Sequence, residues 1–379
     1  MDRDKLKLFA AISSIIVGLF TFFPSSSAIA QQKAIGPGKE AEIRTTVSAF
    51  MAANSIPGVS VAIVENGEFE WSAGFGLADL EHSVPATAQT LFRLASISKT
   101  FTATATMLLW QNGKLDLDAP VQKYCPIFPQ KPYPITTRQL LAHLGGIRNG
   151  ATEPIDRPET VVVRHFEDPI QGGLQLFKDD PLIDNPGRSQ HYSGYGYVVV
   201  GCVIEGASGE KYADYVREHV LLPAGMTDTR VDNHYDIVPH RSRFYSKDKT
   251  GSIVNSQPSD SSGVLPADGW LSSADDLAKF EVALLNDRLV KRSTRDLMWT
   301  SVHGADNEEK YYALGWGTGE NFGISHVGHG GGDYGTSTFI TMAPDRRCGV
   351  VVLMNLNGGN ASDLVTKLFK ILVAPRDAD

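Results

Sequence analysis

The chain has 379 residues, of which 42% are hydrophobic and 21% are charged, as in a soluble globular protein of one or two domains. The formal net charge of −8 argues against nucleic acid or an anionic membrane surface as a partner. The three cysteines, Cys125, Cys202 and Cys348, do not form a disulfide framework, and no two of them have metal-ligand spacing.

The first 30 residues differ from the rest of the chain. A charged start, residues 1–7, leads into an apolar run at 8–23, and Ala28-Ile29-Ala30 matches the pattern of a cleavage site. The apolar run is shorter than the ~20 residues that a spanning helix needs. We therefore expect residues 1–30 to be a removed export signal, the alternative being an uncleaved anchor, and residues 31–379 to be periplasmic or secreted.

An exported chain could pair two of its cysteines. Cys202, however, lies within the apolar segment "YGYVVVGCVIEGA", where a small buried hydrophobic residue is the simpler interpretation. The pattern leaves the pairing open.

The elements that precede the middle of the chain have clear signals. Residues 40–54 have the apolar spacing of an amphipathic helix. Residues 58–76 alternate around Asn66-Gly67, which predicts a β-hairpin. A further helix is expected from Ser96 to the stop signal Asn112-Gly113.

The rest of the chain is first helical and then rich in strands. Helices joined by long loops are expected over 115–290, the clearest in "ITTRQLLAHLGGI" and "SSADDLAKFEVALLN". After residue 310, four segments indicate strands: "YYALGWGTG", "ISHVGHGG", "TSTFITMAP" and "CGVVVLMNLN"; the helix "ASDLVTKLFKIL" follows them. We therefore expect an α+β fold whose antiparallel sheet uses both chain ends (about 40–95 and 310–379), with a mainly helical part at about 96–309 and a cleft at the junction.

The sequence contains three Ser-x-x-Lys patterns, at Ser96, Ser208 and Ser246. Only Ser96 begins an apolar helix, where a lysine three residues later, Lys99, stands beside the serine hydroxyl. Burial disfavours the charged form of an amine, so such a lysine could accept the serine proton. A capping serine followed by a lysine that reaches solvent is the alternative.

Two further segments favour the catalytic interpretation of Ser96 and Lys99 over the capping one. "NPGRSQHYSGYGY" places Tyr192 before a buried helix, and "SHVGHGGGDYG" places His329 in a glycine-rich strand. In the order Ser-x-x-Lys, Tyr-Ser-x, His-x-Gly, these motifs resemble the serine β-lactamase and penicillin-binding protein superfamily. The resemblance runs from about residue 40 to 372 and is greatest to the class C β-lactamase-like branch of peptidases and esterases, which includes the β-lactamase-like peptidases.

The resemblance implies a β-lactamase/transpeptidase-like fold and a role for each matching residue. Ser96 would be the nucleophile that accepts the acyl group, and Lys99 would accept its proton. Tyr192 would protonate the leaving group and later activate water. His329 would contact Tyr192 or a substrate carboxylate. The backbone N–H groups of Ser96 and Gly332 would form the oxyanion hole.

Two glycines complete the implied site. Gly331 would line the edge strand beside the substrate. Gly194 stands where β-lactam-hydrolysing members usually have an asparagine that binds the acyl-amide group, so a side-chain donor and acceptor is missing there. We therefore expect an acyl-enzyme peptidase, D-Ala-D-Ala carboxypeptidase-like enzyme or esterase rather than a true β-lactamase.

Other classes fit less well. No Gly-x-Ser-x-Gly elbow of an α/β-hydrolase occurs. His326 and His329, three apart on a strand, should lie on opposite faces, so we expect no metal and no cofactor. His143 is interpreted as a helix histidine with its partners satisfied. The rival from another class is a non-catalytic sensor of peptidoglycan or β-lactams, which would not need Ser96, Lys99 and Tyr192 together.

The expected partner is a small-molecule or peptide substrate, and the sequence leaves the oligomeric state open. Segment 150–185 is expected to shape the entrance of the cleft.

Overall fold

The computed structural model describes residues 35–150, 164–306 and 312–374. The predicted export signal lies outside these ranges, and so do residues 151–163 of the predicted entrance segment.

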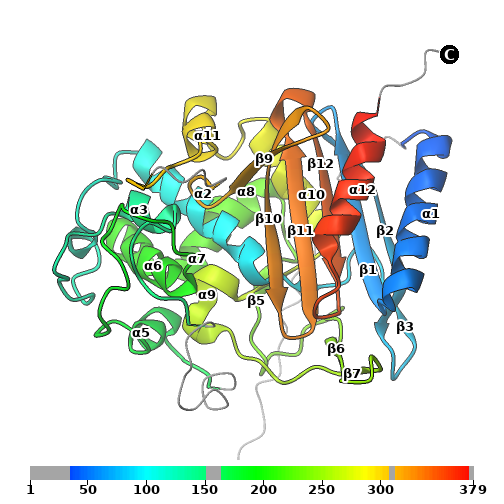
Figure 1. Ribbon diagram of the computed structural model, residues 1–379, viewed down its shortest axis with the longest axis horizontal. Coiled ribbons are helices and arrows are strands. Elements are labelled where there is room, and N and C mark those ends of the chain that lie inside the picture. The colour runs from blue at the N-terminus through cyan, green and yellow to red at the C-terminus, as the bar shows by residue number, and fades with distance from the viewer. Residues whose placement is uncertain (1–34, 151–163, 307–311, 375–379) are drawn as a thin grey trace, which may run out of the picture. The chain divides into compact units, whose positions relative to one another are not determined.

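Strands from both ends of the chain form one antiparallel sheet, drawn in blue and orange in Figure 1. The order in the described residues is β3-β2-β1-β12-β11-β10-β9, and Val59 of β1 lies opposite Met354 of β12. This confirms the predicted α+β fold. The strands are β1 (Gly58–Glu65), β2 (Glu68–Asp79), β3 (Val84–Pro85), β9 (Gly317–Asn321), β10 (Ile324–Asp333), β11 (Thr336–Ala343) and β12 (Cys348–Met354).

The predicted hairpin is present, with β1 and β2 joined at Asn66 and Gly67. Both turn residues have positive φ, 55° and 75°, which matches the twist of the strands that they connect. β1 is nearly continuously buried rather than half-exposed. The reason is that helices cover both faces of the sheet.

One face is covered by α1 (Pro37–Asn54) and α12 (Ala361–Val373), which lie together in front of the sheet in Figure 1. Their apolar side chains, Ile43 and Phe369 among them, share a core with residues of β1 and β12. On the other face, α10 (Ala274–Leu285) packs against β1 and β12. The backbone N–H of Asp276 donates to the side chain of the N-cap Ser273, so the predicted start of this helix is confirmed.

The helical part surrounds α2 (Ser98–Gln111), which is buried along most of its length. This helix ends at Gly113, whose φ is 71°. The other helices of the described residues are α3 (Thr137–Leu141), α5 (Pro169–Leu174), α6 (Gly194–Ser208), α7 (Tyr212–Val216), α8 (Leu222–Ala224), α9 (Leu265–Asp268) and α11 (Arg292–Met298).

Short elements connect these helices. Single turns of 3₁₀ helix lie at η1 (Ala95–Ile97), η2 (Val121–Lys123), η4 (Ser262–Val264) and η5 (Pro344–Arg346), and a π-helical turn, η3, at Arg217–Leu221. Two small sheets add β4 (Phe92–Arg93), β8 (Trp270–Ser272) and β5 (Arg230–Val231), and the pair β6 (Tyr245–Lys247) and β7 (Ile253–Asn255).

Two predicted elements are shorter than expected. The helix in "ITTRQLLAHLGGI" is only Thr137–Leu141, because the backbone turns at His143, which has a φ of 59°. The strand in "YYALGWGTG" begins at Gly317, and Tyr312 forms only an isolated bridge. In both cases local backbone geometry overrides an apolar pattern.

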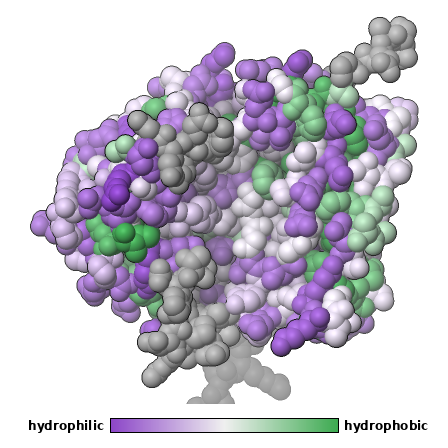
Figure 2. Space-filling model, in the orientation of Figure 1, coloured by the Kyte–Doolittle hydropathy of each residue, from purple (hydrophilic) through white to green (hydrophobic). Residues whose placement is uncertain are grey.

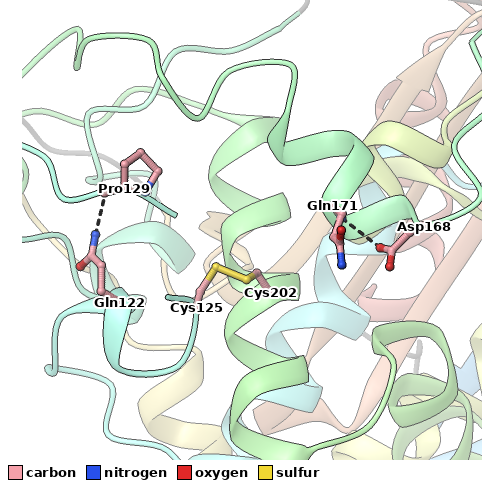
Figure 3. Close-up of a disulfide and its surroundings, with 6 residues drawn as sticks. All are labelled: Gln122, Cys125, Pro129, Asp168, Gln171 and Cys202. Carbon is pink, nitrogen blue, oxygen red and sulfur yellow. Dashed lines mark hydrogen bonds between the residues drawn. A yellow bond between two sulfur atoms is a disulfide. The ribbon is translucent and has the colours of Figure 1, made fainter. Parts of the chain in front are cut away.

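A disulfide joins Cys125, which follows η2, to Cys202 in the middle of α6 (Figure 3). Cys202 is buried, as predicted, but the interpretation as a simple hydrophobic residue was wrong. The two cysteines are 77 positions apart in the sequence, which hides their proximity, whereas their Cα atoms lie 5.4 Å apart. Cys348 is buried and has no disulfide partner.

The face of the molecule shown in Figure 2 is mostly hydrophilic, and the apolar residues that appear on it form separate patches. Within the described ranges, no helix combines the length and the apolar character that a membrane crossing requires.

Candidate active site

Ser96 and Lys99 are in direct contact at the start of the buried helix. Ser96 lies in η1, which continues into α2, and the amine of Lys99 lies 2.9 Å from the Ser96 hydroxyl. The Lys99 side chain is 2% exposed, and its amine also donates to the carbonyl oxygen of Ala267 in α9 at 3.0 Å. The alternative of a lysine that reaches solvent is therefore wrong, because Lys99 points inward and is fixed on the serine.

The other two Ser-x-x-Lys patterns do not form such a pair. Ser208 donates to the carbonyl oxygen of Ile204, while Lys211 pairs with Asp168 at the surface. The hydroxyl of Ser246 bonds to that of Ser256. The burial of the helix that follows Ser96 is thus the context that distinguishes the first pattern.

The turn that carries Ser96 is held tightly against the sheet. Ala95 has a φ of 50°, an uncommon conformation for a residue with a side chain. The hydroxyl of Thr338 in β11 donates to the carbonyl oxygen of Leu94. A Cβ atom on Gly331 of β10 would lie 2.1 Å from the same oxygen, so only glycine allows this approach.

Tyr192 lies across from this turn, two residues before α6. Its ring centroid is 4.9 Å from the amine of Lys99, and its side chain is 41% exposed. The structure thus brings together three side chains of the motifs: Lys99, which is buried, Ser96, which is partly exposed, and Tyr192, which is open to solvent.

His143 packs against Tyr192 and was not predicted to lie here. The two ring centroids are 4.2 Å apart, and the backbone N–H of Ser193 donates to Nδ1 of His143. Its Nε2 is buried without a hydrogen-bond partner in the described residues. Burial, together with the charge of Lys99, holds the pKa of His143 well below its usual range, so the ring is neutral. The interpretation of His143 as a helix histidine with its partners satisfied was wrong, because the residue lies after the end of α3 and its Nε2 has no partner in the described residues.

His329 lies on β10 and accepts a hydrogen bond from an unexpected partner. The hydroxyl of Tyr312 is 2.8 Å from Nε2 of His329, whereas the ring of Tyr192 is 6.5 Å away. Burial, and secondarily the charge of Lys99, lowers the pKa of His329 to about 3. His326 is on the opposite face of the strand, near Phe369 of α12, as its spacing predicted.

Gly332 borders open space, whereas Gly194 has neighbours at ordinary contact distance. A Cβ atom on Gly332 would have no neighbour within 4 Å, and the residue pairs with Ser337 at the edge of the β10–β11 ladder. Gly194 is the first residue of α6, and its backbone N–H donates to the Asn149 side chain at 3.2 Å. A Cβ atom on Gly194 would lie 3.6 Å from Ala267 and Asn149, which is ordinary van der Waals contact.

A buried carboxyl group, Asp268, lies behind the lysine at the end of α9. Burial and the nearby Asp333 raise its pKa, although the charges of Lys99 and Arg93 oppose the shift. One of its oxygens has no hydrogen-bond partner in the described residues. The carboxyl group of Asp268 therefore tends to stay protonated beside the Lys99 amine.

Sequence reasoning missed three of these groups. Tyr312 lies in an isolated bridge, where no periodicity exists to mark it. Asp268 follows Ala267 in "LPADGW", where no local pattern distinguishes a buried carboxyl group from an exposed one. His143 was visible in "LLAHLGG", and the paired glycines after it were the signal that the helix stops there.

Residues 43–374 match the beta-lactamase family. The chain is 31% identical over 379 aligned residues to the serine beta-lactamase-like protein LACTB, mitochondrial, of Homo sapiens, an alignment that covers 76% of this chain and 69% of that protein.

Two solved structures share the fold at more than a quarter identity. The octameric penicillin-binding protein homologue from Pyrococcus abyssi has a TM-score of 0.76 and 28% identity, covering 88% of this chain and 77% of that one. The D-stereospecific amidohydrolase from Streptomyces sp. has a TM-score of 0.74 and 26% identity, covering 87% of this chain and 98% of that one.

Proposed function

This chain belongs to the beta-lactamase family, most of whose members are serine hydrolases, and we propose that it hydrolyses an amide or ester through an acyl-enzyme on Ser96. The observation that carries the proposal is the buried amine of Lys99, 2.9 Å from the Ser96 hydroxyl. A serine needs a base within hydrogen-bond reach to become a nucleophile, and the amine of Lys99 lies within that reach.

Acylation follows from this geometry. The Ser96 oxygen attacks the substrate carbonyl carbon while its proton passes to the amine of Lys99, which can accept it only in the unprotonated form. The hydrogen bond to the Ala267 carbonyl orients that amine toward Ser96. As the tetrahedral intermediate collapses, the bond to the leaving group breaks, and the leaving amine or alkoxide takes a proton from Tyr192.

Deacylation runs the same proton path in reverse. A water molecule loses a proton to Tyr192, attacks the acyl carbon and releases the acid, and Ser96 regains its proton from Lys99. Tyr192 suits this role because its ring lies 4.9 Å from the amine of Lys99 and its side chain is open to solvent.

The negative charge of each tetrahedral intermediate requires fixed donors. We assign these to the backbone N–H groups of Ser96 and Gly332. The close packing of Gly331 against Leu94, which brings β10 to the turn that carries Ser96, supports this assignment. Losing one such donor typically slows acyl transfer by ~10²–10³-fold.

The substrate class that fits best is a short peptide, amide or simple ester. Gly194 presents no side-chain amide to a β-lactam, which disfavours a true class C-like β-lactamase. The D-stereospecific amidohydrolase among the similar structures supports amides of D-amino acids as the first substrates to try.

We further propose that the protein is exported and acts in the periplasm or outside the cell. The disulfide between Cys125 and Cys202 supports this, because such bonds persist in oxidising compartments.

A covalent probe tests the mechanism. A fluorophosphonate or a fluorescent penicillin should label the wild-type protein and the variant Ser208→Ala, which removes the serine of another Ser-x-x-Lys pattern. Labelling should disappear in Ser96→Ala and fall strongly in Lys99→Ala. Thermal melting of each variant establishes that it is folded.

A turnover screen then separates the candidate substrates. It compares p-nitrophenyl esters, D- and L-aminoacyl amides, D-Ala-D-Ala peptides and nitrocefin. Wild-type protein that binds penicillin without labelling or turning over any of these would instead be a non-catalytic sensor.

A further inference from the structure

Three side chains from separate segments meet beside a surface cavity. His165 precedes α5, His234 follows β5, and Asp260 precedes η4. One nitrogen or oxygen atom from each lies within 4.8 Å of the others. The cavity has a volume of about 490 Å³, and His234 and Asp260 line it. Neither Ser96 nor Lys99 does, so this cluster is separate from the candidate active site.

Asp260 is the fixed member of the cluster. Its side chain is only 2% exposed, and its Oδ1 accepts the backbone N–H of Ser262 at 2.8 Å. Its other oxygen, Oδ2, faces the two histidines.

Both histidines approach that one oxygen through the same ring nitrogen. Nδ1 of His165 and Nδ1 of His234 each lie 2.8 Å from Oδ2 of Asp260. The two rings are nearly perpendicular, with centroids 5.4 Å apart. The ring of Tyr235 packs against both of them. Two nitrogens and one anionic oxygen thus face one small volume.

We propose that His165, His234 and Asp260 bind a zinc ion, with water or a ligand from the cavity at the fourth position. Two imidazoles and a carboxylate form a ligand set that binds zinc in preference to magnesium or calcium. Zinc would take the lone pairs of both Nδ1 atoms, so each neutral imidazole would carry its proton on Nε2 instead of on the nitrogen that now faces Asp260.

The distances are compatible with this exchange. Bonds of ~2.0–2.1 Å in a tetrahedral site place neighbouring ligand atoms about 3.3 Å apart. Each histidine therefore needs to move by about half an ångström from its present 2.8 Å contact. His234, 41% exposed at its side chain, has room to do so, and the N–H of Ser262 orients the carboxylate as outer-shell partners of metal ligands commonly do.

A second cluster of metal-binding residue types, Asp79, Glu81 and His82, differs in a way that makes it a useful control. It offers one imidazole, and Oδ1 of Asp79 already accepts the backbone N–H groups of Glu81 and His82 within a turn. It is an acidic surface turn formed by one short segment of the chain.

Zinc at the first cluster would join three loops at the mouth of the cavity. Asp260 begins the short segment that runs through η4 into α9, whose Ala267 carbonyl holds Lys99. The ion would therefore stabilise the segment that leads from Asp260 to the Ala267 carbonyl. The metal site itself does not depend on the proposed hydrolase activity.

Zinc binding to the whole protein tests the inference. Protein treated with chelator and then freed of it is titrated with zinc chloride by calorimetry, and bound metal is measured after dialysis. The wild-type protein and His82→Ala should each take up one equivalent at saturation. His234→Ala should bind at least ~10-fold more weakly, and H165A/H234A should not bind.

Cobalt provides a second readout, since Co²⁺ in a tetrahedral site absorbs visible light strongly. The wild-type spectrum should show these bands and His234→Ala should lose them. Absence of saturable zinc binding by the wild-type protein would overturn the proposal, and so would one retained equivalent in H165A/H234A. The side chain of His234 is 41% exposed, so His234→Ala should fold even if the double variant does not. The single variant then tests the proposal by itself.

Discussion

The hydroxyl of Tyr312 donates a hydrogen bond to Nε2 of His329 at 2.8 Å. The other ring nitrogen of His329, Nδ1, lies 2.7 Å from the carbonyl oxygen of Gly330 and must donate to it. The two bonds together fix one neutral tautomer. Tyr312 and His329 therefore present an uncharged pair beside β10.

The neutral state of His329 predicts the shape of the pH–rate profile. With a pKa of about 3, His329 stays unprotonated between about pH 5 and pH 8, so its titration contributes nothing to an acid limb in that range. His329→Asn should lower kcat/KM but leave the shape of the profile unchanged. An acid limb that disappears in the variant would show that the imidazole titrates during turnover.

Tyr192→Phe should stall turnover without loss of folding. Removing the hydroxyl takes away the proposed acid and base for the leaving group and water, a contribution of typically ~10²–10⁴-fold. The side chain is 41% exposed, so the free energy of unfolding should change by less than ~0.5 kcal/mol. Ester and amide hydrolysis are compared with Tyr133→Phe, a control at another exposed tyrosine, and turnover that survives in Tyr192→Phe would assign proton transfer to another group.

Gly194→Asn should raise activity on β-lactams. The space beside Gly194 allows the substitution, because a Cβ atom at this position meets only ordinary contacts at 3.6 Å. The new amide can bind the acyl-amide group of a cephalosporin. Nitrocefin hydrolysis is compared with Gly194→Ala, which adds the Cβ atom without the amide. Equal rates in both variants would mean that the missing amide does not limit β-lactam turnover.

Glu281 should make the protein less stable as pH rises. It lies within α10, fully buried, with neither carboxyl oxygen hydrogen-bonded in the described residues, and burial raises its pKa well above the ordinary 4.5. Above that value the unfolded chain releases the proton while the folded chain keeps it, so stability falls until the folded pKa is reached.

Glu281→Gln removes this titration and should therefore be more stable relative to the wild type at pH 8 than at pH 4. Urea unfolding of both proteins at the two pH values measures the difference, in which the contributions of all other groups cancel. A relative stability that is the same at both pH values would mean that Glu281 is ionised in the folded protein.

The disulfide should contribute substantially to stability. Closing a loop between Cys125 and Cys202, which are 77 positions apart, restricts the unfolded chain, an effect of typically ~2–4 kcal/mol. The double variant C125A/C202A should lose this amount in urea unfolding. Dithiothreitol should destabilise the wild type and leave the double variant unaffected, which separates the bond from any effect of the reductant on Cys348.

The elements that could be predicted from sequence are those whose signals are local. The turn at Asn66-Gly67 sets its own hairpin, and the three-residue spacing of Ser96 and Lys99 on a helix places their side chains together. The sheet built from both chain ends followed from the strand patterns and was confirmed.

The features that escaped prediction depend on contacts between distant segments. Tyr312 and His329 meet because an irregular bridge lies beside β10, and Cys125 meets Cys202 because the turn after η2 lies against α6. The zinc-binding cluster that we propose joins His165 to Asp260 across 95 residues. Neither spacing nor periodicity carries such information.

The pairing of β1 with β12 has a consequence for how the protein folds. β12, which completes the centre of the sheet, is synthesised long after its partner β1, so the sheet cannot close until β12 has left the ribosome. Folding should be slow, should be completed only after β12 has been synthesised, and should fail in any truncation that removes this strand.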